Sequence, residues 1–84
     1  MTPLQELEEI QKIASATNAA PADTLRKCNA LTEDRVQDRI NAGDTELQAR
    51  RHVLSGRDPI AARLYKLACD LGEQMAYQNH IFLG

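Results

Sequence analysis

The sequence has few of the residues that stabilise a small protein on their own. Aromatic residues make up only 4% of its 84 residues, and tryptophan is absent. Much of the apolar content is alanine, which buries little surface, so the core of the single domain expected over residues 1–84 is small. A second subunit or another protein would supply the missing apolar contact. We therefore expect a protein that associates with itself or with a partner.

Residues that usually mark a chemical site are also scarce. Two cysteines, Cys28 and Cys69, lack the number and spacing of a disulfide framework or a zinc site, and their small apolar neighbours favour reduced, buried thiols. The two histidines, His52 and His80, are isolated, and no phosphate-binding loop or nucleophile motif is present. The sequence predicts no catalytic residue, no cofactor and no metal, and hence a protein that is not an enzyme.

The charge pattern bears on location and partners. No run of 18 apolar residues exists, and Glu6, Glu8 and Glu9 stand where a signal peptide would be positively charged. The net charge of −2 gives no general attraction to nucleic acid or to an anionic membrane surface. We expect a cytoplasmic protein without membrane contact, for which nucleic acid is a less favoured partner.

Capping residues and apolar spacing predict an all-α fold. Helices are expected near residues 3–17, 21–30, 33–42, 45–54 and 59–80. Thr2, Thr32 and Asp58 are typical residues at helix starts, and Thr45 or the residue before it caps the fourth helix. Gly43 either separates the third and fourth helices or kinks one longer helix. The predicted architecture is a compact four- or five-helix bundle with a long C-terminal helix, and we favour a dimer.

The C-terminal helix carries two apolar faces. Beside its core-facing stripe lies a second face of mostly small residues, which includes Ala62, Tyr65, Cys69 and Ala76. Three of these repeat every seven residues, the spacing that keeps one face turned toward a neighbouring helix. We expect this face to pack against another helix, of the same chain or, as we favour, of the second subunit in a homodimer.

The segment from Lys12 to Lys27 resembles the helix-turn-helix of bacterial DNA-binding regulators. Ala14 stands where that motif needs a small residue at the helix crossing, and Asn18 follows in the turn. The resemblance implies a second helix that reads DNA through Thr24, Arg26 and Lys27. The segment has one residue more than the motif between its turn and second helix, which would rotate that helix away from its usual contact.

Two further stretches are candidates for partner binding. The first is a basic patch, Arg50, Arg51 and Arg57, in a segment without acids between Glu46 and Asp58. Guanidinium groups bind carboxylates bidentately, so a protein partner with an acidic surface is expected there. The second is the apolar C-terminal tail, which consists of Ile81, Phe82 and Leu83.

These features favour a small non-enzymatic interaction protein, of a type common in phages, plasmids and bacterial secretion and regulatory systems. It would act as an adaptor, chaperone or inhibitor that binds and blocks a partner protein. Two alternatives remain open: a helix-turn-helix transcriptional regulator, and a structural subunit of a larger assembly.

Overall fold

The computed structural model describes residues 2–16 and 20–83, and the side chains only as far as residue 76. The described chain contains no strand and forms α1 (Pro3–Ser15), α2 (Pro21–Asn41), α3 (Glu46–Leu54) and α4 (Pro59–Leu83). The all-helical class is therefore confirmed, with four helices rather than five in this part of the chain.

Three helix starts lie where their capping residues predicted them. Thr2 and Thr45 each accept a hydrogen bond from the backbone N–H three residues on, and the glutamine there bonds back to complete a capping box. Asp58 Oδ1 accepts hydrogen bonds from the N–H groups of Ile60 and Ala61, at 2.9 and 3.2 Å, and so caps α4.

The helix start predicted at Thr32 is wrong. Thr32 lies inside α2, which continues unbroken from Pro21 to Asn41, and its hydroxyl donates to the carbonyl of Cys28 at 2.8 Å. A threonine whose hydroxyl donates to a carbonyl of the preceding turn fits inside a helix and does not cap a helix start. The segments expected at 21–30 and 33–42 are therefore one helix.

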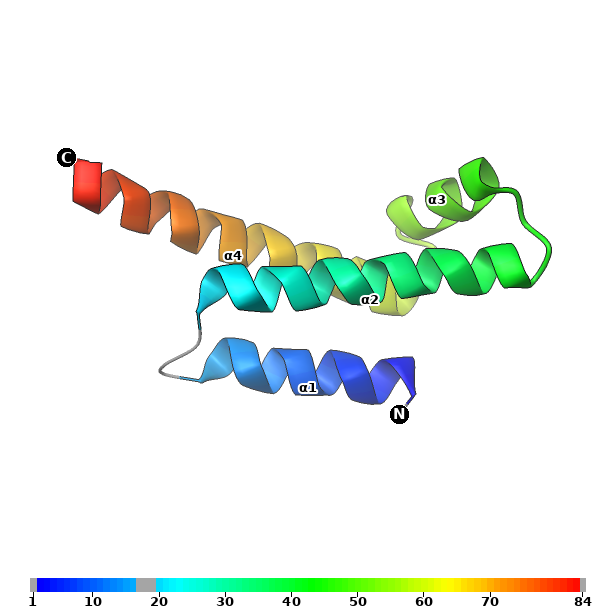
Figure 1. Ribbon diagram of the computed structural model, residues 1–84, viewed down its shortest axis with the longest axis horizontal. Coiled ribbons are helices and arrows are strands. Elements are labelled where there is room, and N and C mark those ends of the chain that lie inside the picture. Colours follow the sequence, from blue (N-terminus) through cyan, green and yellow to red (C-terminus); the bar gives the residue numbers. More distant parts are fainter. Residues whose placement is uncertain (1, 17–19, 84) are drawn as a thin grey trace.

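A turn at Gly43 separates α2 from α3, so the alternative of one kinked helix is also wrong. Gly43 has a φ of 114°, which a residue with a side chain rarely adopts. The turn folds α3 back along the C-terminal half of α2 (Figure 1). On the other side of α2, α1 lies alongside its N-terminal half and runs in the opposite direction (Figure 1).

The core consists of two clusters on either side of α2's midpoint. The larger joins α1, α2 and α4 and consists of Leu7, Ile10, Cys28, Leu31, Leu64 and Leu71. The smaller joins α2, α3 and the start of α4 and consists of Val36, Ala49, Val53 and Ala61. The C-terminal part of α4 projects beyond α1 and α2 (Figure 1), and the molecule is elongated, with extents of 48, 26 and 16 Å.

Candidate functional site

Most arginines of the chain form a salt bridge or a hydrogen bond with another side chain of the same chain. Arg26, Arg35, Arg39 and Arg50 each form at least one salt bridge with an aspartate or glutamate. Arg63 donates to the side chain of Gln11 at 3.0 Å. Within the described residues, this leaves Arg51 and Arg57 as the arginines whose side chains form neither a salt bridge nor a hydrogen bond with another side chain.

Arg50, which the sequence predicts to bind a partner, forms salt bridges within the chain. Its two terminal nitrogens donate to both carboxylate oxygens of Glu33, at 2.9 and 3.1 Å, and its Nε lies 3.3 Å from Glu46. The hydrogen bonds from Arg50 lower the pKa of Glu33, and those to Glu33 and Glu46 raise the pKa of Arg50. Arg50 therefore ties α3 to α2, and its guanidinium is already occupied by carboxylates.

Arg51 and Arg57 lie at one surface hollow, which we call the arginine hollow. It has a volume of about 530 Å³ and is lined by Arg39, Asp44, Gln48, Arg51, His52, Ser55 and Arg57. The end of α3 supplies Arg51, and the turn at Gly56, with a φ of 80°, returns the chain so that Arg57 lines the same hollow. The structure thus brings together two of the three arginines of the predicted patch.

The electrostatics of the hollow follow from its ion pairs. Arg39 Nε lies 2.9 Å from Asp44 Oδ2, so these two charges largely cancel. Arg51 and Arg57 are exposed and give the hollow a net positive charge in a protein whose overall charge is −2. Such a site can bind an anionic group through two planar guanidinium donors.

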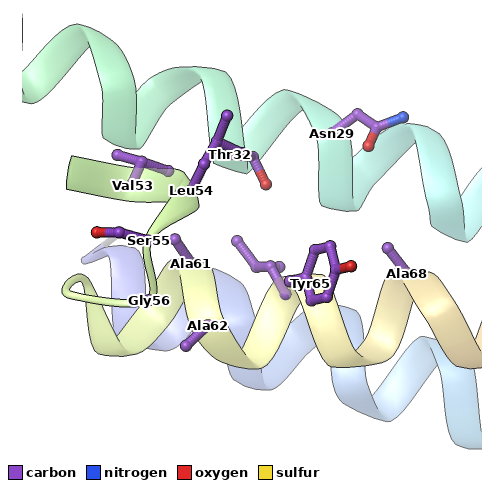
Figure 2. Close-up of a pocket in the computed structure, with 11 residues that line it drawn as sticks. Asn29, Thr32, Val53, Leu54, Ser55, Gly56, Ala61, Ala62, Tyr65 and Ala68 are labelled. Atoms are coloured by element: carbon purple, nitrogen blue, oxygen red, sulfur yellow. The ribbon is translucent and has the colours of Figure 1, made fainter. Parts of the chain in front are cut away.

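An apolar groove opens on the other side of the turn that follows α3. It lies between α2 and α4, has a volume of about 340 Å³, and is closed at one end by Val53, Leu54 and Ser55 (Figure 2). Thr32 of α2 and Tyr65 of α4 also line it. Leu54 and Tyr65 are 72% and 70% exposed, so two large apolar side chains at this groove face solvent.

The outer face of α4, defined by Ala62, Tyr65, Cys69 and Ala76, is largely uncovered. Ala62 is half-buried, whereas the other three are exposed. The face therefore has no packing partner among the described helices of the chain. The expectation that both thiols are buried is wrong for Cys69, while Cys28 is 1% exposed and burial raises its pKa.

The three residues of the helix-turn-helix resemblance do not share one surface. Thr24 is 1% exposed and its hydroxyl donates to the carbonyl of Ala20 at 3.1 Å, so it cannot contact DNA. Arg26 is exposed and paired with Asp23 at 2.9 Å, and Lys27 is exposed. Helices α1 and α2 lie alongside each other (Figure 1), unlike the steep crossing of the motif. The predicted turn residue Asn18 is outside the described residues.

The apolar tail is described only by its backbone. Helix α4 continues through Ile81, Phe82 and Leu83, beyond the end expected near residue 80, but their side chains are outside the described part of the structure. The helix that carries them projects from the bundle (Figure 1).

Sequence reasoning missed a part-buried ion pair between α2 and the start of α4. Arg35 Nε donates to Oδ2 of Asp58 at 2.8 Å, while Asp58 is 3% exposed and caps α4. Burial raises the pKa of Asp58, but the hydrogen bonds from the N–H of Ala61 and from Arg35 outweigh it and leave the pKa below its usual value. This contact has a structural role, because it joins the start of α4 to the middle of α2.

Other kinds of site find no support in the described part of the chain. No group of three or more His, Cys, Asp and Glu side chains there is arranged to hold a metal ion. None of the helices searched has the length and apolar character needed to cross a membrane. Compared with protein-family models, curated proteins and solved structures, the chain matches none of them.

Proposed function

We propose that this protein is a small, cytoplasmic, non-enzymatic interaction module that binds an acidic segment of a partner protein at the arginine hollow. The observation that carries the proposal is the contrast between Arg51 and Arg57 and the other described arginines. Carboxylates or an amide of the chain itself engage the others, whereas no described acid pairs with these two.

The geometry favours carboxylates as ligands. Arg51, from the last turn of α3, and Arg57, from the segment after it, line one hollow, so two acidic side chains of one peptide can each meet a guanidinium group. Arginine is also among the residues that most often dominate the binding energy of a protein interface. An adaptor, a chaperone or an inhibitor would use the hollow in the same way, by binding an acidic segment of the partner and so blocking it.

Fluorescence anisotropy with defined probes tests this proposal. The probes are a labelled peptide of alternating Glu and Ser and a labelled single-stranded oligonucleotide of equal charge. We expect the peptide to bind the wild type and to lose about tenfold or more in affinity with R51E/R57E, since like charges replace complementary ones.

The matched control is K12E/K27E, which makes the same charge change at two exposed lysines away from the hollow. This variant should bind the peptide as the wild type does. Equal loss in both variants would show a nonspecific charge effect and contradict the proposal. Preferential binding of the oligonucleotide, with a steep salt dependence, would instead favour the nucleic-acid alternative.

A further inference from the structure

The outer face of α4 is an unpartnered helix face with a narrow apolar centre. At about 100° per residue, Ala62, Cys69 and Ala76 point within about 40° of one another. Tyr65 lies beside them and is 70% exposed. In a chain with one phenylalanine, two tyrosines and no tryptophan, an aromatic ring left in solvent on this face requires a reason.

Gly72 lies beside the same face and is not explained by the single chain. A glycine inside a helix is less favourable than alanine. The backbone at Gly72 does not need glycine, because its φ is not positive, unlike the φ of Gly43 and Gly56, and a Cβ built at Gly72 would meet no atom within 4 Å. Close approach by a group outside the chain would account for it.

Two residues of opposite charge border the other side of this face. Lys66 and Glu73 lie about 60° and 40° from the direction of Cys69. Both are exposed, and neither forms a salt bridge with another described residue. The basic residue precedes Cys69 and the acidic residue follows it. Two copies of this face therefore match in charge only when their helices run in opposite directions.

We propose that a second copy of this chain covers the outer face of α4 with its own α4, antiparallel and with a two-fold axis at Cys69. Ala62 and Ala76 each lie seven residues from Cys69, so each faces the other residue of the second copy. Lys66 then lies about 1.5 Å along the axis from the level of Glu73 of the second copy, on the same side of the interface. In a parallel pair, the charged sides of the two copies would lie on opposite sides of the interface, so Lys66 and Glu73 would not pair across it.

The same register gives Tyr65 and Gly72 a common role. Tyr65 of one copy lies about 1.5 Å along the axis from the level of Gly72 of the other, on the side opposite the charges. The ring can therefore pack over a position that has no side chain. The antiparallel direction also carries the C-terminal end of the second α4 toward the apolar groove, where Leu54 is 72% exposed.

Sedimentation equilibrium with charge exchange tests the orientation. The wild type should be dimeric, and K66E and E73K should each raise the dimer Kd about tenfold, because each places two like-charged pairs in the interface. The double variant K66E/E73K should recover most of the wild-type affinity. The control K27E changes an exposed lysine on α2 and should leave the Kd unchanged. A monomeric wild type, or a double variant as weak as the single ones, would overturn the proposal.

Disulfide formation between marked copies gives a second, direct measurement. In a C69A background, A62C alone should not link on oxidation, since its two cysteines lie about 21 Å apart along the antiparallel pair. A mixture of C69A/A62C with C69A/A76C should form a mixed dimer joined between positions 62 and 76. Ready linking of A62C to itself would show a parallel pair and overturn the proposal.

This association is independent of the arginine hollow. R51E/R57E should dimerise as the wild type does, and K66E should still bind the acidic peptide. These two measurements therefore distinguish failure of the dimer proposal from failure of the proposed acidic-peptide binding.

Discussion

Replacement of Asp58 by alanine tests the contact that joins α4 to the rest of the bundle. One carboxylate oxygen caps α4 through the N–H groups of Ile60 and Ala61, and the other accepts from Arg35 Nε at 2.8 Å. The site is enclosed, because Asp58 is only 3% exposed. Water can therefore replace only part of what D58A removes.

The magnitude follows from the two kinds of bond lost. Loss of an N-cap costs about 1 kcal/mol, and loss of a charged hydrogen bond costs about 1.5–3 kcal/mol. Arg35 is still 21% exposed and keeps Asp38 at 2.9 Å, which places the second contribution at the low end. D58A should lower the free energy of unfolding by about 2–4 kcal/mol, out of roughly 4–13 kcal/mol for a domain of this size.

Urea unfolding followed by circular dichroism measures the loss. D58N should lie between the wild type and D58A, because asparagine is also a good N-cap but carries no charge for Arg35. The control is D34A, at an exposed aspartate of α2, which should change stability by less than about 0.5 kcal/mol. A D58A variant as stable as the control would refute the role assigned to this contact.

Two further predictions concern pH and packing. The pKa of Asp58 is lowered in the folded protein, so its ionised form stabilises the fold above the usual aspartate pKa of 3.8, and this contribution is lost as the pH falls from there through the folded pKa. D58N should therefore lose less stability than the wild type between about pH 4 and pH 2, as measured by urea unfolding at each pH. An equal loss in both proteins would contradict a role for the ionisation of Asp58. L64A removes a side chain that is 0% exposed in the larger core cluster and should cost about 2–5 kcal/mol, against less than about 1 kcal/mol for L47A at a position 61% exposed. Similar unfolding midpoints for both leucine variants would show that the cluster does not hold the bundle together.

Local signals predicted most of the helices because capping depends on residues close in sequence. Thr2, Thr45 and Asp58 act within three residues of their own positions. The same reasoning failed at Thr32, since a threonine followed by acids also fits a helix interior when its hydroxyl bonds back to the preceding turn. Local sequence alone does not distinguish these two uses of threonine.

The candidate site was less predictable because it depends on contacts between distant segments. The run that includes Arg51 and Arg57 identified the basic surface. The structure was needed to show that Arg50 binds Glu33, 17 residues earlier, and that Arg39 of α2 lines the hollow. The heptad spacing of α4 predicted an apolar outer face, but the structure was needed to show that the described helices leave this face uncovered.

The most direct test of the proposed function is affinity capture of the tagged protein from lysate of its source cell, with nuclease present, followed by mass spectrometry. The wild type and K12E/K27E should retain the same discrete protein partner, and R51E/R57E should lose it while keeping its helical circular dichroism spectrum. Retention of that partner by R51E/R57E, or recovery of material only when nuclease is omitted, would contradict an acidic protein partner at the arginine hollow.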